Sequence, residues 1–301
     1  MSPSRLEMFA KTPYMYFVKY VLGVRELDEP VLEERGWLNA LTRGTILHEA
    51  YEQFVQGLGR IPREGDEAAL RQALDDALHA QYEKRGRPPS EHIEAIIEHQ
   101  LWEDAQILIQ AEVERAAPGM APTHFEWSFG FDGSDVPPAV LPIGDGTLHL
   151  RGSADRIDTV NGALEIWDYK TGKSDNFDPQ DGLSADRWSL QWLLYAWAAE
   201  ALLNKTVRRS GYYFATRREM GRRIEYELNA DYSAKGRRIL KTLSAMAKSG
   251  VFVPSEQSME RDKWRYNFDT LVADRDEHKN RDKNSLSYDR PHLHKSILNP
   301  D

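Results

Sequence analysis

Two aspartates and a lysine lie around a predicted tight turn. Asn161 and Gly162 separate two strand-like stretches, and this pair favours a two-residue hairpin turn because both residues tolerate a positive φ. Pairing outward from the turn places Asp155 directly opposite Asp168, with Lys170 two residues further along on the same face. Two acids and an amine gathered in this way could hold a cation or share a proton.

Opposed acids destabilise a sheet, so the pair needs an explanation. A divalent cation is one, because carboxylates on two rigid strands leave positions open for water and a phosphate. A shared proton is a second, and an accidental pair at a wet sheet edge is a third. The same register opposes Asp158 and Glu165 on the other face, where Arg156 can compensate them, so opposed acids alone are not diagnostic. Lys170 favours the cation, because an ammonium there can orient water and offset charge on a phosphoryl group.

The run Gly172-Lys173-Ser174 resembles the end of a phosphate-binding P-loop. That loop needs a glycine five residues before Gly172, and this chain has Trp167 there. A tryptophan cannot make the turn that lets backbone N–H groups surround a phosphate. We therefore disfavour nucleotide binding at this site.

The surrounding residues predict helices first and strands afterwards. Helices are predicted over 4–22 with a break at Pro13, 43–59, 64–84, 90–116, 188–203 and 231–249. Strands are predicted over 124–131, 148–160, 163–170, 207–216 and 222–228, with a loop over 132–146. This order predicts one α/β domain over residues 1–272, with a helical insertion at about 60–117. Residues 273–301 are highly charged and predict a flexible tail.

Composition limits the classes to which the protein can belong. With 301 residues, 41% of them hydrophobic, the chain can bury a large core. No run approaches the roughly 20 apolar residues of a membrane span, and the first residues contain no apolar signal-peptide core. The absence of cysteine excludes a thiolate nucleophile and cysteine-ligated metals. We therefore expect a cytoplasmic protein without a membrane partner.

Charge is unevenly distributed along the chain. The net charge of −9 disfavours a protein that coats DNA through bulk positive charge. Between Lys205 and Arg223, however, seven basic residues, among them Arg217 and Arg218, stand against one acid, Glu219. Such a stretch is typical either of a solvated strand edge or of a surface that follows a phosphate backbone.

Five motifs, in the right order, resemble one nuclease family, the RecB-like exonuclease branch of the PD-(D/E)xK nuclease superfamily. In chain order they are SRLEMFAKTPYMYF, RGTILHEAYE (43–52), GSADRID (152–158), EIWDYKTGK (165–173) and QWLLY (191–195). The resemblance covers most of residues 4–216. It implies an α/β fold with a restriction-endonuclease-like mixed sheet flanked by helices, and an added helical layer.

The resemblance also implies roles for individual residues. The metal ligands it implies are His48, Asp155, Asp168 and the backbone carbonyl of Tyr169. Lys170 matches the catalytic lysine and acts together with the carboxylates. Glu126 matches a weaker acidic position that binds the metal directly or through water.

Four further residues are assigned to nucleic-acid contact. Gln191 and Tyr195 match the family's Q-x-x-x-Y pair and lie on one helical face, since they are four residues apart. The resemblance implies that they contact the scissile strand or support Lys170. Arg217 and Arg218, in the basic stretch, are expected to contact the phosphate backbone.

The chain departs from many relatives, which hold an iron–sulfur cluster with four cysteines. Thr12 stands where the first cysteine would be, and residues 252–268 stand where the other three would be. We therefore expect Mg²⁺ or Mn²⁺ and no iron–sulfur cluster. The N- and C-terminal segments must then be held by packing, with Tyr14, Phe17, Trp264, Tyr266 and Phe268 as candidates.

These observations favour a metal-dependent DNA nuclease, with an exonuclease mode, in DNA repair, recombination or foreign-DNA processing. The alternative is a nuclease-like protein that binds DNA or serves as a scaffold in a helicase complex. Another chain would supply the helicase, because this one has no ATPase motif. A carboxylate-pair glycosidase is disfavoured, because Lys170 offers that chemistry no benefit.

Overall fold

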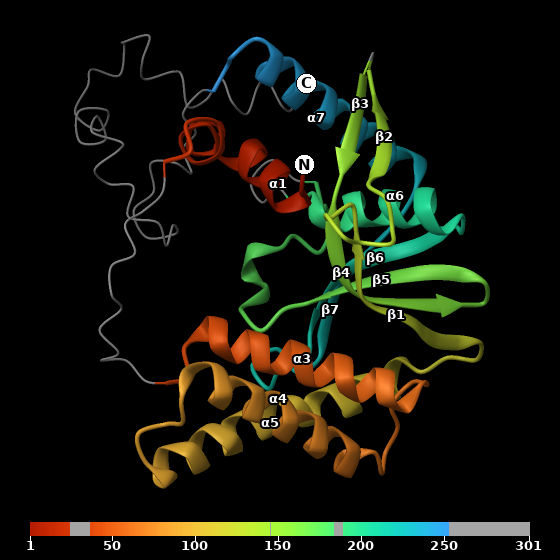
Figure 1. Ribbon diagram of the computed structural model, residues 1–301. Coiled ribbons are helices and arrows are strands. Elements are labelled where there is room, and N and C mark those ends of the chain that lie inside the picture. Colours follow the sequence, from red (N-terminus) through yellow and green to blue (C-terminus); the bar gives the residue numbers. More distant parts are fainter. Residues whose placement is uncertain (25–36, 145, 184–188, 253–301) are drawn as a thin grey trace.

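A five-stranded mixed sheet lies between two sets of helices (Figure 1). The computed structural model describes residues 1–24, 37–144, 146–183 and 189–252. In sheet order the strands are β1 (Met120–Phe129), β4 (Gly152–Val160), β5 (Ala163–Tyr169), β6 (Val207–Phe214) and β7 (Arg222–Glu227). Only β5 and β6 run parallel, and the other neighbours are antiparallel. The mixed sheet between helices confirms the predicted fold class.

The β4–β5 hairpin has the predicted register. Asn161 and Gly162 form the turn with φ of 50° and 87°, as a type I′ turn requires. Val160 pairs with Ala163, and the ladder continues to Arg156 opposite Trp167. The residue pattern of period two and the tight turn therefore decide which side chains share a face.

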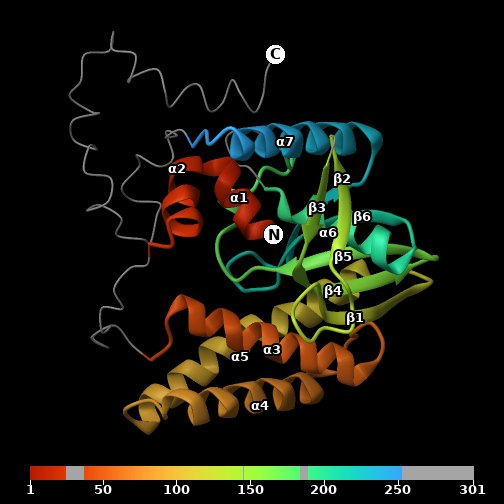
Figure 2. The ribbon, with the colours of Figure 1, turned by 45° about the horizontal axis from the view of Figure 1, so that its top comes forward.

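Three helices cover one face of the sheet. They are α3 (Ala40–Leu58), α4 (Glu67–Arg85) and α5 (Glu91–Arg115), and Figures 1 and 2 show them together on one side. Tyr51 of α3 packs there with Trp167, Tyr169 and Tyr213 from β5 and β6. Ser90 begins α5 as predicted, since its hydroxyl accepts a hydrogen bond from the Ile93 N–H at 3.3 Å.

The other face is covered by α6 (Gln191–Leu203), which is apolar on nearly all sides and fully inside the core. Around it lie α1 (Pro3–Lys11), α2 (Pro13–Tyr16), a π-helical turn at Phe17–Val21, and α7 (Ala230–Lys248). The predicted break at Pro13 is confirmed. Phe17 stacks on Phe252, with ring centroids 4.9 Å apart, so aromatic packing joins the two ends of the described chain.

Two strand predictions were wrong. The interval predicted as a loop contains β2 (Ala139–Ile143), which pairs with β3 (Gly146–Leu150) in a separate two-stranded sheet. The strand predicted over 148–160 is therefore broken at Arg151, where the chain passes from β3 to β4. Pro142 disguised β2, but a two-stranded sheet has only edge strands and tolerates proline.

Three of the predictions concern residues that lie outside the described ones. They are the tail over 273–301, the domain boundary at 272 and the packing of Trp264, Tyr266 and Phe268. Within the described residues, none of the helices combines the length and apolar character that crossing a bilayer requires.

Candidate active site

The hairpin carries two acids at the point where its strands separate. Asp155 and Asp168 are the next opposed positions after the Arg156–Trp167 pair, which is the last pair of the ladder. Instead of a further main-chain bond, the Tyr169 N–H donates to the Asp155 carboxylate at 2.6 Å. This hydrogen bond orients Asp155 at the end of the strand.

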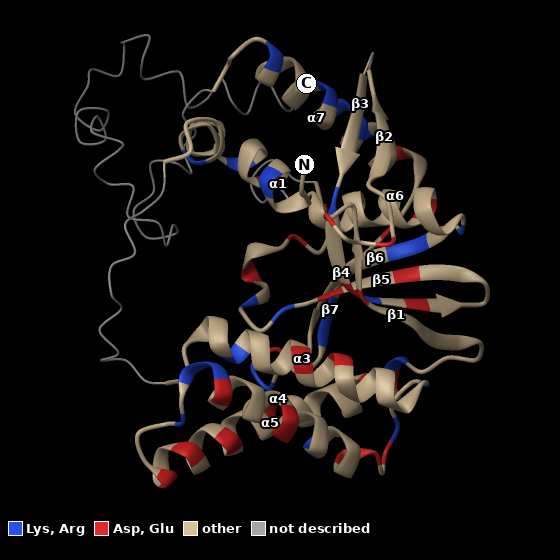
Figure 3. Ribbon diagram, viewed as in Figure 1, with Lys and Arg blue, Asp and Glu red and all other residues tan. Residues whose placement is uncertain are grey.

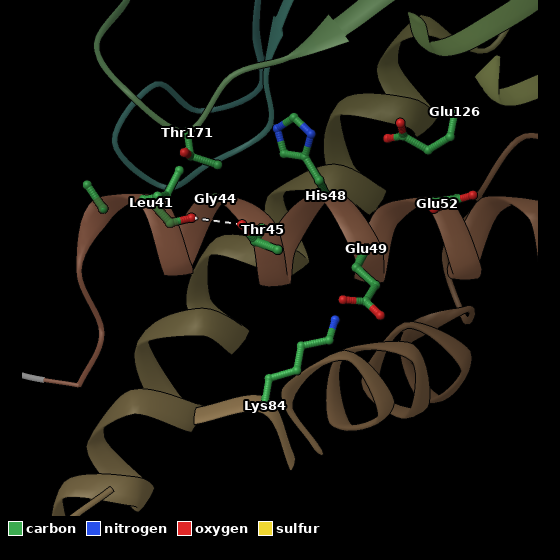
Figure 4. Close-up of a pocket in the computed structure, with 10 residues that line it drawn as sticks. Leu41, Gly44, Thr45, His48, Glu49, Glu52, Lys84, Glu126 and Thr171 are labelled. Atoms are coloured by element: carbon green, nitrogen blue, oxygen red, sulfur yellow. Dashed lines mark hydrogen bonds between the residues drawn. The ribbon is translucent and has the colours of Figure 1, made fainter. Parts of the chain in front are cut away.

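His48 and Glu126 approach Asp155 from other elements. The Nδ1 atom of His48, on α3, lies 3.4 Å from Asp155 Oδ2. Glu126 lies on β1 opposite Asp155, between the pairs Phe125–Arg156 and Trp127–Ala154. Figure 4 shows the His48 ring projecting from α3, with the Glu126 side chain beside it. One ligand atom from each of the three residues lies within 4.8 Å of the others.

Glu126 has an unusual backbone. Its φ of 39° lies in the left-handed region, which non-glycine residues seldom adopt. Strained backbone of this kind concentrates at functional sites, where the surroundings hold it in place. Ser153 contributes by donating its hydroxyl to Glu126 Oε2 at 3.3 Å.

Asp168 belongs to a second cluster beside the first. It forms an ion pair with Lys170, whose backbone N–H is fixed by the carbonyl of Tyr213 on β6 at 2.9 Å. Gln191, the first residue of α6, donates its side-chain amide to Asp168 Oδ1 at 2.9 Å. The same amide lies 3.3 Å from the Tyr195 hydroxyl. Gln191 therefore contacts Asp168 directly, and Lys170 only through that carboxylate.

The electrostatics of the site follow from burial and crowded charge. Burial, and then the nearby Asp168 carboxylate, raise the pKa of Asp155 well above its ordinary value. Burial and then Glu52 raise the pKa of Glu126. Burial lowers the pKa of Lys170, but the Asp168 carboxylate and other acids outweigh it, so the net shift is upward.

These properties fit a divalent cation. Carboxylates crowded together in a partly buried place repel one another, and a cation removes that repulsion. Burial is the main cause that lowers the pKa of His48, so its ring is held neutral, the form that binds metal. The His48 ring also forms a hydrogen bond with the backbone of Tyr169. The Tyr169 side chain faces away, because its hydroxyl accepts from Arg156 at 3.1 Å on the opposite face of the sheet.

A cleft of about 690 Å³ opens beside His48, between α3 and the loop that follows β5. The residues that line it include Leu41, Gly44, Glu49, Lys84 and Thr171. Acidic positions gather where α3 approaches the sheet, and basic positions lie on β6 and β7 (Figure 3).

The basic stretch of 205–223 is divided between the two ends of β6. Lys205 precedes the strand, whereas Arg217 and Arg218 follow it, at the end where β5 leads into Lys170. Arg217 forms an ion pair with Glu103 of α5, and its backbone N–H donates to Asp104 at 3.0 Å. Arg218 is exposed.

A contact between the loop after β5 and the β6–β7 turn was missed from the sequence. The Ser174 hydroxyl donates to Glu219 at 2.7 Å, and Arg222 donates to the same hydroxyl at 2.9 Å. This anchors the loop that carries Thr171 and Lys173. The signal was present, because Glu219 is the one acid in the basic stretch.

Comparison with known proteins confirms the resemblance. Residues 1–272 match the sequence profile of the PD-(D/E)XK nuclease superfamily. The chain is similar to an ATP-dependent helicase/deoxyribonuclease of Clostridium botulinum strain Hall, with 29% identity over 231 residues, covering 70% of this chain and 18% of that protein. An ATP-dependent helicase/deoxyribonuclease of Clostridium tetani is 27% identical over 189 residues, covering 58% of this chain and 16% of that protein. The chain spans less than one fifth of the length of these relatives.

Proposed function

Because the chain belongs to the PD-(D/E)XK nuclease superfamily, we propose that it is a metal-dependent deoxyribonuclease that hydrolyses phosphodiester bonds. The observation that carries this proposal is the meeting of two clusters at one end of the β4–β5 hairpin. His48, Glu126 and Asp155 bring ligand atoms within 4.8 Å of one another. Asp168 and Lys170 form an ion pair beside them.

The first cluster is the proposed cation site, completed by Asp168 and the carbonyl of Tyr169. Carboxylate oxygens suit Mg²⁺, and the imidazole of His48 makes Mn²⁺ equally acceptable. The cation supplies Lewis-acid polarisation of a phosphate oxygen and activation of water.

The other side chains position and stabilise. Lys170 places an ammonium where negative charge grows on the phosphoryl group, and Asp168 holds that ammonium in place. Gln191 in turn holds Asp168 through its amide. Rigid placement of this kind converts a bimolecular attack into an effectively unimolecular one.

The DNA backbone is proposed to pass the loop after β5 and the turn after β6. Lys173 and Arg218 are both exposed there and lie at the same end of the sheet as Lys170. Arg217 is joined to Glu103, but its side chain is 62% exposed and can exchange that partner for a phosphate. Contacts of this kind make binding weaken steeply with salt.

The relatives are named helicase/deoxyribonucleases, and this supports two finer parts of the proposal. We propose that the substrate is DNA, degraded from strand ends during repair, recombination or removal of foreign DNA in the cytoplasm. We also propose that a helicase, supplied by another chain, separates the strands.

Cleavage of DNA in the presence of Mn²⁺ tests the proposed function. The wild-type protein is expected to degrade linear single- or double-stranded DNA and to leave closed circular DNA intact. Asp168→Ala should lower the rate at least about 100-fold, because Lys170 and Gln191 both lose their shared partner. Asp132→Ala, at an exposed turn, is the matched control and should cleave normally. Equal rates for wild type and Asp168→Ala would contradict the proposal.

Calorimetric titration with MnCl₂ tests the cation site without activity. His48→Ala should weaken Mn²⁺ binding at least about tenfold, since loss of a partner in a metal site has effects of this size. His92→Ala, which removes an exposed imidazole on α5, is the control and should bind as the wild type does. A wild-type protein that binds no Mn²⁺ would instead favour a scaffolding role.

A further inference from the structure

The helix that carries Gln191 has no capping residue of its own. The residue before it, Leu190, offers no side-chain hydrogen bond to the first turn of α6. Three other long helices, α3, α5 and α7, begin at Asn39, Ser90 and Asn229, whose side chains accept such bonds. The first N–H groups of α6 therefore need a partner from elsewhere in the fold.

Glu7 of α1 supplies that partner. The Gln191 N–H donates to Glu7 Oε1 at 2.9 Å, across a sequence separation of 184 residues. The Glu7 side chain is only 17% exposed, and its second oxygen lies 3.9 Å from Lys11 Nζ. A carboxylate suits this position because the N-terminus of a helix carries partial positive charge.

Glu7 also lies near the catalytic lysine. Its carboxylate is one of the negative charges, with Asp168 and Asp155, that act on the Lys170 ammonium. It acts likewise on the hydroxyls of Tyr195 and Tyr212. Glu7 thus faces the site even though α1 contributes none of the proposed ligands.

A continuous set of contacts leads from Glu7 to the reacting groups. Glu7 holds the main chain of Gln191, whose side-chain amide donates to Asp168. Asp168 in turn holds Lys170. The position of the Gln191 amide depends on where α6 begins, because a side chain is aimed by its backbone.

We propose that Glu7 is a positioning residue of the active site, which caps α6 and thereby aims Gln191 at Asp168. This role rests on the nuclease function proposed above. It assigns α1 a part in catalysis, since α1 supplies the carboxylate that orders the first turn of α6.

Steady-state cleavage of linear DNA by three variants tests the proposal. Glu7→Ala is expected to lower kcat about tenfold, as a small misplacement of a catalytic group does, with KM changed less than about twofold. Glu7→Gln should recover part of the loss, because its amide oxygen still accepts the N–H but carries no charge. Asn229→Ala removes the cap of α7 and should keep the wild-type kcat. Both alanine variants remove one capping bond, so thermal melting should show similar losses of stability.

Amide hydrogen exchange over residues 189–195 provides a readout that does not depend on cleavage. Exchange there should be faster in Glu7→Ala than in the wild type or in Asn229→Ala. An active wild type with an equally active Glu7→Ala would overturn the positioning role alone, as would an equal loss of kcat in Asn229→Ala. A wild type that cleaves no DNA would overturn the nuclease function and this role with it.

Discussion

Replacement of Lys170 by methionine is expected to lower the rate of DNA cleavage about 1,000-fold, in the range seen when a transition-state donor is removed. Methionine keeps the length of the side chain but removes the ammonium that lies against Asp168. Negative charge that develops on the phosphoryl group then has no cation from the protein beside it.

Two measurements separate this effect from damage to the fold or to the metal site. Mn²⁺ binding by Lys170→Met should persist, because Lys170 is no ligand and its removal lessens positive charge near the site. Lys248→Met, at the exposed end of α7, is the control and should cleave at the wild-type rate. A Lys170→Met protein that cleaves within tenfold of the wild type would assign the chemistry to another group.

Replacement of Arg156 by methionine is expected to lower the free energy of unfolding by about 3–5 kcal/mol, the range for breaking a buried ion pair. Arg156 is fully buried. Its guanidinium donates to Asp158 at 2.8 Å and to Glu112 of α5 at 2.9 Å. Arg115 of α5 contacts the same two acids, so two arginines balance two carboxylates.

The loss of one arginine leaves a buried negative charge without its partner. Denaturation by urea, followed by circular dichroism, gives the free energy of unfolding. Arg217→Met breaks the exposed ion pair with Glu103 and should change that free energy by no more than about 1 kcal/mol. A similarly small change in Arg156→Met would show that these buried charges do not hold α5 to the sheet.

The buried network also bears on the site through the hairpin. Arg156 adjoins Asp155, and Tyr169, whose hydroxyl accepts from Arg156, adjoins Asp168. Successive residues of a strand point to opposite faces. The hairpin therefore fastens one face to α5 and presents the proposed catalytic groups on the other.

Local patterns were reliable where short-range physics decides the structure. Asn161-Gly162 made the predicted turn, Ser90 capped α5 and Pro13 separated α1 from α2. Each depends on residues within a few positions of one another. The strand β2 escaped because Pro142 argues against a strand unless the strand lies at an edge, which only the tertiary structure reveals.

The sequence by itself determined that Asp155, Asp168 and Lys170 share one face, because the turn sets the register and strand side chains alternate. Resemblance added the family and its candidate residues. Only the tertiary structure decided which groups meet that face: His48 from α3, Glu126 from β1, and Gln191 aimed by Glu7 from α1. Contacts between elements far apart in the chain depend on how helices and strands pack, and the periodicity within each element carries no record of its neighbours.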